Sequence, residues 1–253
     1  MSDTDRAVAA LKAAKNIVFF TGAGISAESG IPTFRDKLTG VWSTHDPEKL
    51  ETAKAFRENP ALVWGFYLWR RNQMSQAKPN AAHLAIQRLA TSGPNVAVIT
   101  QNIDDLHERA GSADVAHLHG SLKTPKCFAC GRTAELQLCH YELPHHAVEC
   151  DPPRCPRCNG RLRPSIIWFG EDLSSVVWKS AVATVQRCDV LFSVGTSGIV
   201  TPAAEIPQIA RAAGAAVIHV NLVDVPLRTL DELMIVGRAA EALPALLSAA
   251  CGI

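Results

Sequence analysis

Four cysteines of this chain stand in two pairs, and in each pair two residues separate the thiols. The pairs are Cys127 with Cys130 and Cys155 with Cys158. This spacing lets one tight turn present two sulfurs to a single metal ion, and two such turns complete a tetrahedron of thiolates around Zn²⁺. Four thiolates fill every coordination position, so we expect a structural zinc and chemistry elsewhere. A disulfide pair and a redox-active pair are the alternatives, and two copies beside Pro or Gly turn residues favour zinc.

The insert that carries these pairs, residues 123–163, is rich in Cys, Pro, His and Arg and shows no sustained hydrophobic periodicity. A segment so poor in apolar residues needs a metal to hold its fold. Five other residues of the insert are the rival ligands, namely Cys139, His140, His145, His146 and Cys150.

A second chemical signal follows the apolar run Ile17–Phe20, where the chain reads Thr-Gly-Ala-Gly-Ile-Ser. Gly22 and Gly24 allow a tight turn, and the N–H groups of the following helix can bind the oxygens of a pyrophosphate. Ala27 stands where an ordinary dinucleotide fingerprint has its third glycine, and no acidic residue ends a second strand about twenty residues later. The loop therefore predicts a nucleotide site of an unusual kind. A tight turn that binds nothing is the alternative.

Small and polar residues directly follow several other apolar runs. Because ligands of open α/β sheets bind beyond the carboxyl ends of the strands, such residues would meet at one edge. Helix capping and turn formation are the alternative roles of each residue, but their repetition favours a ligand site. His119 precedes Gly120 at an expected chain reversal, where an imidazole can titrate near neutrality. The residues that follow the runs are Gln101, Asn102, Asp104, Gly195, Thr196, Ser197 and Asn221.

The elements that must hold these residues alternate between short apolar runs and helical patterns. This alternation predicts an α/β fold, a Rossmann-like doubly wound parallel sheet with a small zinc-binding domain. From residue 31 to residue 58 we expect a long irregular loop. The expected strands are Ile17–Phe20, Val96–Thr100, Val190–Val194 and Ala216–Val220, and the expected helices are Ala61–Ser75, Ala81–Ala90, Val176–Gln186, Ala203–Ala213 and Ala240–Ala249.

Composition narrows the class of protein. The 253 residues allow one large core plus a small module. A net charge of +1 and a charged fraction of 19% give no basic face for nucleic acid. The polar, acidic start of the chain is unlike a signal peptide, no apolar stretch is long enough to span a bilayer, and the cysteines suit a reducing compartment. We therefore expect a cytoplasmic protein with neither nucleic acid nor a membrane as a direct partner.

Six motifs, taken together and in order, resemble the sirtuins, the NAD⁺-dependent protein-lysine deacylases. The resemblance covers nearly the whole chain, from Lys15 to Pro244. The motifs are the segment from Gly22 to Arg35, Thr100-Gln-Asn-Ile-Asp104, His119-Gly120, the two cysteine pairs, Trp168-Phe-Gly-Glu171 and Gly195-Thr-Ser197.

The resemblance implies a Rossmann-type NAD-binding domain, a small domain that carries the zinc, and a cleft between them for NAD⁺ and an acylated lysine. The partners that it implies are acylated-lysine proteins or peptides. The NAD-binding domain would comprise residues 1–35, 76–122 and 164–253. Residues 36–75 would form a cofactor loop and the helical part of the small domain, and residues 123–163 would form its zinc-binding module.

The resemblance also implies a reaction. The amide oxygen of the acyl-lysine attacks C1′ of the nicotinamide ribose, and nicotinamide leaves. A general base then helps a ribose hydroxyl attack the resulting imidate, and water yields free lysine and O-acyl-ADP-ribose. His119 stands at the position of that base, and the ordinary histidine pKa of about 6.5 suits the role.

By the same resemblance, the remaining site residues fall into two groups. Phe169, Gly170 and Glu171 would pair with the substrate backbone as an added strand, a mode that reads little side-chain sequence. Ile167 and Trp168 belong to the same substrate segment. The cofactor-binding group comprises Gly22, Ala23, Gly24, Ser26, Ala27, Pro32, Phe34, Arg35, Gln101, Asn102, Ile103, Asp104, Gly195, Thr196, Ser197, Asn221 and Ala239.

Tyr67 and Arg70 lie three residues apart in an expected helix, so they share a helix face. A guanidinium binds a carboxylate with two hydrogen bonds, and a phenol can add a third. The pair resembles the Tyr-x-x-Arg of the sirtuin branch that removes succinyl and malonyl groups, and on this resemblance it would bind an acyl carboxylate. A packed tyrosine beside a solvated arginine is the alternative.

Glu51 departs from the pattern of that branch. Aligned from Trp42 and Phe56, it takes the place of a small alanine that leaves room there for the acyl chain. A carboxylate at this point would repel a succinyl group or pair with Arg70. Alternatively Glu51 faces water, which is the commoner fate of a glutamate. The acyl preference therefore stays open.

Two other activities fit the same cleft. One is mono-ADP-ribosyl transfer onto a protein, and the other is NAD⁺ sensing by a binding module without catalysis. Among deacylases, a deacetylase with no preference for acidic acyl groups is the alternative to a desuccinylase or demalonylase.

Overall fold

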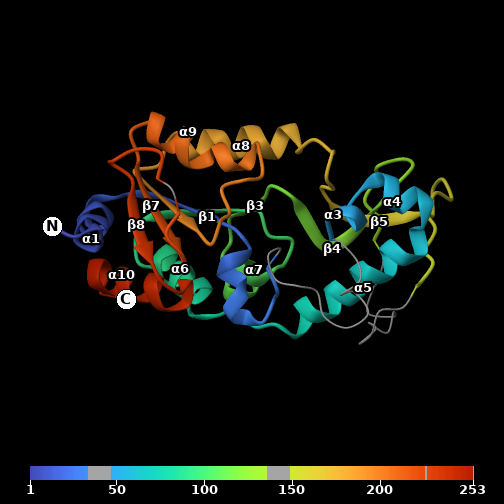
Figure 1. Cartoon of the computed structure of the whole chain (residues 1–253), viewed down its shortest axis with the longest axis horizontal. Helices are drawn as coiled ribbons and strands as arrows, with labels where there is room; N and C mark the ends of the chain where they lie inside the picture. Colours follow the sequence, from blue (N-terminus) through green and yellow to red (C-terminus); the bar gives the residue numbers. More distant parts are fainter. Residues whose placement is uncertain (34–46, 136–148, 226, 253) are drawn as a thin grey trace.

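The computed structural model describes residues 1–33, 47–135, 149–225 and 227–252. Six parallel strands form the central sheet in the order β3-β2-β1-β6-β7-β8 (Figure 1). This order, which reverses beside β1, is that of a doubly wound nucleotide-binding sheet. The strands are β1 Asn16–Thr21, β2 Asn95–Thr100, β3 Val115–His117, β6 Val190–Val194, β7 Ala216–Asn221 and β8 Leu233–Val236.

Helices cover both faces of this sheet. Alternate residues of β1 point to opposite faces, so Ile17 and Phe19 pack with α1, α6 and α10, whereas Val18 and Phe20 pack with α8 and α9. Figure 1 shows α8 and α9 on one side of the sheet and α6 and α10 on the other. A sheet that is buried on both faces needs strands that are apolar along their whole length. The helices are α1 Asp3–Ala13, α6 Ala81–Thr91, α8 Ser175–Val185, α9 Ile206–Ala212 and α10 Ala239–Cys251.

The carboxyl ends of β2, β1 and β6 meet at one edge of the sheet, because the three strands run parallel. Thr21 at the end of β1 pairs with Thr100 on one side and with Val194 on the other. The strand order reverses at β1, so this edge is the place where ligands of such folds bind.

A smaller group of elements continues the molecule beyond the sheet, on the right of Figure 1. Its core is aromatic and includes Phe56, Phe66, Tyr67 and Trp168. Its longest helix, α5, begins at a proline, whose missing N–H is not needed in a first turn. The elements of this group are α3 Pro47–Leu50, α4 Ala53–Glu58, α5 Pro60–Gln76 and the antiparallel pair β4 Gly120–Cys127 and β5 Leu162–Ile166.

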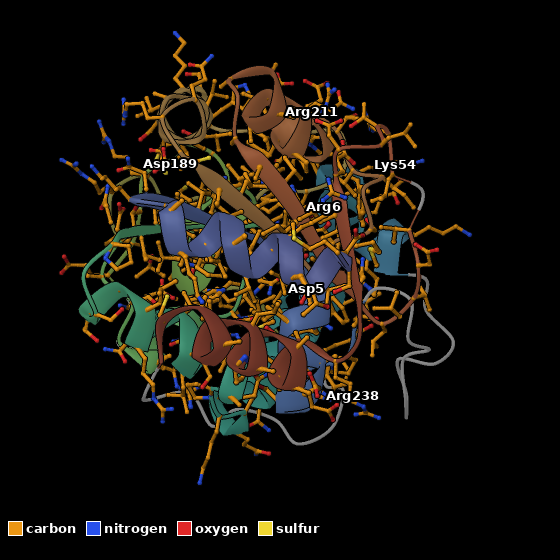
Figure 2. The ribbon with its side chains drawn as sticks, turned by 90° about the vertical axis from the view of Figure 1, so that its left-hand side faces the viewer. Asp5, Arg6, Lys54, Asp189, Arg211 and Arg238 are labelled. Atoms are coloured by element: carbon orange, nitrogen blue, oxygen red, sulfur yellow. The ribbon has the colours of Figure 1, made fainter. Side chains whose placement is uncertain are left out.

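The opposite end of the molecule shows how the sheet is fastened at its amino ends. Asp189, just before β6, accepts hydrogen bonds from the N–H groups of Lys15 and Asn16 at 2.8 Å each. Figure 2 views the molecule from the side of α1 and α10 and labels Asp189 and Arg211 there. Arg211 forms an exposed ion pair with Asp231, whereas the interior of this end is apolar.

The four strands predicted from the sequence are confirmed as β1, β2, β6 and β7. The edge strands β3 and β8 have three and four residues, too few to show an alternating pattern. The expected helix 203–213 is a 3₁₀ turn, Ala203–Glu205, followed by α9, because Pro207 restarts the helix in its first turn. The loop expected from residue 31 to residue 58 is wrong for residues 47–50 and 53–58, which are helical. No described helix is long and apolar enough to cross a membrane.

Candidate active site

Three glycines bring the turn after β1 into contact with the loop after β6. A short helix, α2 (Ala23–Ser26), begins directly after Gly22. A Cβ atom on Gly22 would lie 2.7 Å from the Gly195 carbonyl oxygen, and one on Gly24 would lie 2.6 Å from Gly195 Cα. Gly195 has a φ of +60°, and a Cβ there would lie 2.5 Å from the Ile25 nitrogen. Glycine alone fits these positions, so bare backbone forms this part of the ligand edge.

Three polar side chains beside this turn form a buried network that we call the strand-end cluster, made of Ser26, Asn102 and Asp104. Asn102 Nδ2 donates to Ser26 Oγ at 3.2 Å and to the Gly22 carbonyl at 3.1 Å, and Ser26 Oγ donates to Asp104 Oδ2 at 3.0 Å. The Leu106 N–H donates to Asp104 Oδ1 at 3.1 Å. Burial raises the pKa of Asp104, and these hydrogen bonds oppose the rise. The cluster is therefore fixed before any ligand arrives.

His119 joins the same edge from the turn between β3 and β4, where Gly120 has a φ of +75°. Its Nδ1 donates to the Gln101 carbonyl at 3.1 Å, which leaves the lone pair of Nε2 free. Burial lowers the pKa of His119, and the hydrogen bond to Gln101 partly opposes this change. The ring is therefore neutral at pH 7 and can accept a proton through Nε2.

The neighbouring histidines are less suited to proton transfer. The two ring nitrogens of His117 lie 2.9 Å from the Asn102 carbonyl oxygen and 2.8 Å from Glu108 Oε1, so both are occupied. His83 and His107 are buried against each other, with ring centroids 4.8 Å apart. Of these histidines, His119 is thus the best placed general base.

The ends of β6 and β7 add polar groups to this edge. Thr196 Oγ1 lies 2.9 Å from Ser193 Oγ, and Asn221 Nδ2 donates to the Thr196 carbonyl at 2.9 Å. Ser197 is exposed, and Ala239 is buried in the first turn of α10. The residues expected to bind the adenosine half thus lie largely on the loops of two adjacent strands. The other expected cofactor residues that the structure describes are half-buried, namely Ala23, Ala27, Pro32, Gln101 and Ile103.

The expected substrate segment lies directly beside His119. The Ile167 N–H donates to the His119 carbonyl at 2.9 Å. Further along, Phe169 is 42% exposed and Gly170 is also exposed. Phe169 forms a parallel bridge with Thr52, so the backbone here already pairs as a strand does. An exposed backbone of this kind can add a substrate chain as a further strand.

Trp168 and Glu171 of the same segment turn inward. Trp168 is 1% exposed, and its indole N–H donates to the Tyr67 hydroxyl at 2.9 Å. The Arg163 guanidinium carbon lies 3.3 Å from the centroid of the Trp168 ring, and Arg163 forms an ion pair with Glu171. Glu171 also accepts the Trp168 N–H at 3.0 Å. These contacts hold the segment in place. The sequence does not predict this role of Arg163, because arginine is usually exposed.

A third set of residues, which we call the Glu51–Arg70 group, consists of Glu51, Tyr67 and Arg70. All are buried, with 5% of Glu51 and 8% of Arg70 exposed. Burial raises the pKa of Glu51 to about 7, and the positive charge of Arg70 opposes the rise. Of the two alternatives for Glu51, exposure to water is therefore wrong, and its carboxylate lies inside near Arg70. Its backbone carbonyl accepts the Phe169 N–H at 2.9 Å, which fixes Glu51 beside the substrate segment.

The cysteine pairs come together where the β4–β5 pair ends. The four Sγ atoms lie within 4.8 Å of one another, with Cys127 and Cys158 sulfurs 3.4 Å apart and Cys130 and Cys155 sulfurs 4.0 Å apart. A tetrahedron with Zn–S bonds of about 2.3 Å has sulfurs about 3.8 Å apart, which matches this size. Backbone N–H groups of Arg157 and Cys158 lower the pKa of Cys155 to about 7, whereas, against a backbone hydrogen bond from Gly160, the neighbouring Cys127 thiol raises the pKa of Cys158 to about 12. The residues fit one structural zinc ion.

Some expected residues do not join these groups. Cys150 packs against Trp64 and Leu68 rather than with the four zinc cysteines. The residues that lie outside the described part of the chain are Phe34 and Arg35 of the cofactor group and the rival ligands Cys139, His140, His145 and His146.

Known proteins resemble this chain over nearly its whole length. The sequence profile of the Sir2 family matches residues 22–202. An NAD-dependent protein deacylase of Pseudomonas putida is 62% identical over 249 residues, which cover 98% of this chain and 95% of that protein. A solved complex of a Sir2 homologue with NAD has a TM-score of 0.85 and 40% identity, and the match covers 96% of this chain and 92% of the other. The solved structure of a Sir2 protein bound to a myristoylated histone peptide has a TM-score of 0.78 and 34% identity, with 98% and 96% covered.

Proposed function

The chain belongs to the Sir2 family, and from this membership we propose that it is an NAD-dependent protein-lysine deacylase. The observation that carries the proposal is the placement of His119. Its neutral ring keeps Nε2 free, and its carbonyl accepts a hydrogen bond from the substrate segment. A nucleotide ribose and an acylated lysine would therefore meet at one proton acceptor. In this proposal the NAD-binding domain comprises residues 1–35, 76–122 and 164–253, and the small domain comprises residues 36–75 and 123–163.

NAD⁺ is consumed as a substrate and supplies a ribose whose bond to nicotinamide can be broken. The residues at the strand ends fit this ligand, because the glycine turn leaves bare backbone at the position of the phosphates. Asn102 and Asp104 would hold the ribose and the nicotinamide, already oriented by their hydrogen bonds to each other through Ser26. His119 Nε2 would take the proton of a ribose hydroxyl. The structural zinc would hold the small domain and take no part in this chemistry.

We further propose that the acyl groups removed include acetyl and the dicarboxylic groups succinyl and malonyl, with nicotinamide and O-acyl-ADP-ribose as products. Arg70 supports this part of the proposal. It is a buried guanidinium that donates no hydrogen bond within the described residues, and its Nε is enclosed without a partner. An acyl carboxylate would accept hydrogen bonds from Arg70 and from the Tyr67 hydroxyl.

The macromolecular substrate would be an acylated-lysine protein or peptide. Its backbone would pair with the exposed Phe169 and Gly170, which contact the chain without reading its sequence closely. A solved relative that holds a myristoylated histone peptide supports this class of partner.

A mass-spectrometric panel tests the proposal. Matched acetyl-, propionyl-, malonyl- and succinyl-lysine peptides are incubated with the full chain, with and without NAD⁺. The expected result is loss of the acyl group only when NAD⁺ is present, with one nicotinamide released for each lysine freed. ADP-ribose attached to protein with the acyl group retained would identify a transferase, and NAD⁺ binding without any nicotinamide release would identify a sensor. Either result would overturn the proposal.

A further inference from the structure

The Glu51–Arg70 group combines two opposite charges that are buried without hydrogen bonds. Glu51 is 5% exposed and Arg70 is 8% exposed. In the part of the chain that the structure describes, no hydrogen bond reaches the Glu51 carboxylate or leaves the Arg70 guanidinium. Withdrawing charges from water without giving them hydrogen-bond partners is destabilising. Polar groups left in this state point to a ligand that completes them.

The group is joined to His119 through the substrate segment. The carbonyls of His119 and Glu51 each accept a backbone N–H of that segment, both at 2.9 Å. Between these two contacts, the Trp168 indole donates to the Tyr67 hydroxyl at 2.9 Å. A lysine whose backbone pairs with Phe169 and whose acyl carbonyl lies near His119 would direct its acyl tail to the Glu51–Arg70 group.

The charged groups around Glu51 determine which charge is available to a ligand at this position. Tyr67 and Arg70 face it from α5, and Arg163 acts on Tyr67 from β5. The charge of Arg163 is already matched by its ion pair with Glu171. Burial raises the pKa of Tyr67 well above its ordinary value, so the phenol keeps its proton and remains a donor. Among the residues that the structure describes, the positive charge left for a ligand is therefore that of Arg70, and Glu51 is placed to neutralise it.

We propose that Glu51 is a specificity-determining residue that controls whether a dicarboxylic acyl group can bind, an inference that rests on the proposed deacylase function. An ionised Glu51 neutralises Arg70 and repels an acyl carboxylate. A protonated Glu51 offers an O–H donor instead, so a succinyl or malonyl carboxylate accepts hydrogen bonds from Arg70, Tyr67 and Glu51 together. An acetyl group carries no charge and is accepted in both states.

The direction of the pH dependence follows from this scheme. The pKa of Glu51 is raised to about 7, so the protonated form dominates below that pH and the ionised form above it. The ratio of desuccinylation to deacetylation is thus highest in mild acid and falls by up to about tenfold for each pH unit above 7. Both substrates depend equally on His119, so its titration cancels in the ratio.

Initial-rate assays over about pH 6 to about pH 9 test the proposal, with kcat/KM measured on matched succinyl- and acetyl-lysine peptides. Glu51→Gln keeps the shape of the side chain and cannot ionise. For this variant, the ratio of desuccinylation to deacetylation is expected to be independent of pH. At alkaline pH it should be roughly tenfold or more above the wild-type ratio. Glu58→Gln is the matched control, because Glu58 is exposed on α4, and it should follow the wild type.

Calorimetry with the unmodified enzyme gives an independent measurement. In buffers of different ionisation enthalpy, the succinyl peptide should take up a proton on binding above pH 7 and the acetyl peptide should not. A wild-type ratio that does not change with pH, a Glu51→Gln ratio equal to that of the wild type, or binding without proton uptake would overturn the role of Glu51. Failure of the wild type to remove acetyl groups with NAD⁺ would overturn the deacylase function instead, so the two failures are distinct.

Discussion

The strand-end cluster and the Glu51–Arg70 group are both buried, but they differ in how their polar atoms are paired. In the strand-end cluster, Ser26, Asn102 and Asp104 bond to one another and to backbone groups. In the Glu51–Arg70 group, a carboxylate and a guanidinium are enclosed without hydrogen bonds within the described residues. The first arrangement suits a ligand that is the same in every turnover, the dinucleotide. The second suits an acyl group whose charge can vary.

His119→Ala tests the residue at which the ligands of the two regions would meet, and it should have the largest effect on activity. Loss of the proton acceptor is expected to lower kcat by about 10² to 10⁴. Loss of the Nδ1 hydrogen bond to the Gln101 carbonyl should lower the free energy of unfolding by about 0.5–1.5 kcal/mol, and calorimetric binding of ADP-ribose should weaken by no more than about tenfold. His117→Gln is the matched control, since both nitrogens of His117 already have partners. A near-normal rate for His119→Ala would remove His119 from the mechanism.

Gly195→Ala should disrupt the glycine turn beside the strand-end cluster and leave the Glu51–Arg70 group unchanged. The new Cβ would lie 2.5 Å from the Ile25 nitrogen, in a residue with a φ of +60°. NAD⁺ affinity, measured by calorimetry, should fall by at least about tenfold, since the turn must open to admit the methyl group. Gly198 also has a positive φ, of +66°, but open space around it. Gly198→Ala should therefore cost only about 1–2 kcal/mol in stability from the left-handed backbone. Equal NAD⁺ affinities in the two variants would contradict the close contact.

Tyr67→Phe should separate the structural role of the Glu51–Arg70 group from its proposed role in acyl binding. The change leaves the Trp168 indole N–H buried without its acceptor, which is expected to lower the free energy of unfolding by about 1–3 kcal/mol. Urea unfolding measures this loss, and NAD⁺ affinity should not change. Unaltered stability would mean that the 2.9 Å hydrogen bond contributes nothing to the free energy of unfolding.

Arg211→Ala is expected to have the smallest effect of these substitutions. Arg211 and Asp231 form an exposed ion pair far from both regions, on the end of the molecule seen in Figure 2. Exposed pairs contribute less than about 1 kcal/mol, so stability should change within that range and the ratio of acyl preferences should not move. A shift in acyl preference here would show that the assay reports general stability rather than the Glu51–Arg70 group.

The two regions also differ in how far the sequence predicts them. Gly22, Gly24, Asn102 and Asp104 lie in short contiguous motifs at strand ends, so a local pattern is enough to place them together. His119 is predicted from its position before Gly120 and from the family resemblance.

The surroundings of Glu51 depend instead on contacts between distant segments. Glu51 is buried because its carbonyl and the adjacent Thr52 pair with Phe169, far away in the chain. Arg163 is likewise buried by its contacts with Trp168 and Glu171. Glutamate and arginine are usually exposed, so no local pattern predicts that these two are inside.

The most direct test is a crystal structure of the chain with ADP-ribose and an acetyl-lysine peptide. We expect the phosphates against the glycine turn and a ribose hydroxyl within about 3.2 Å of His119 Nε2. The peptide backbone should pair with Phe169, and the acyl group should point to Glu51 and Arg70. A ribose bound away from His119, or a lysine that enters elsewhere, would contradict this arrangement.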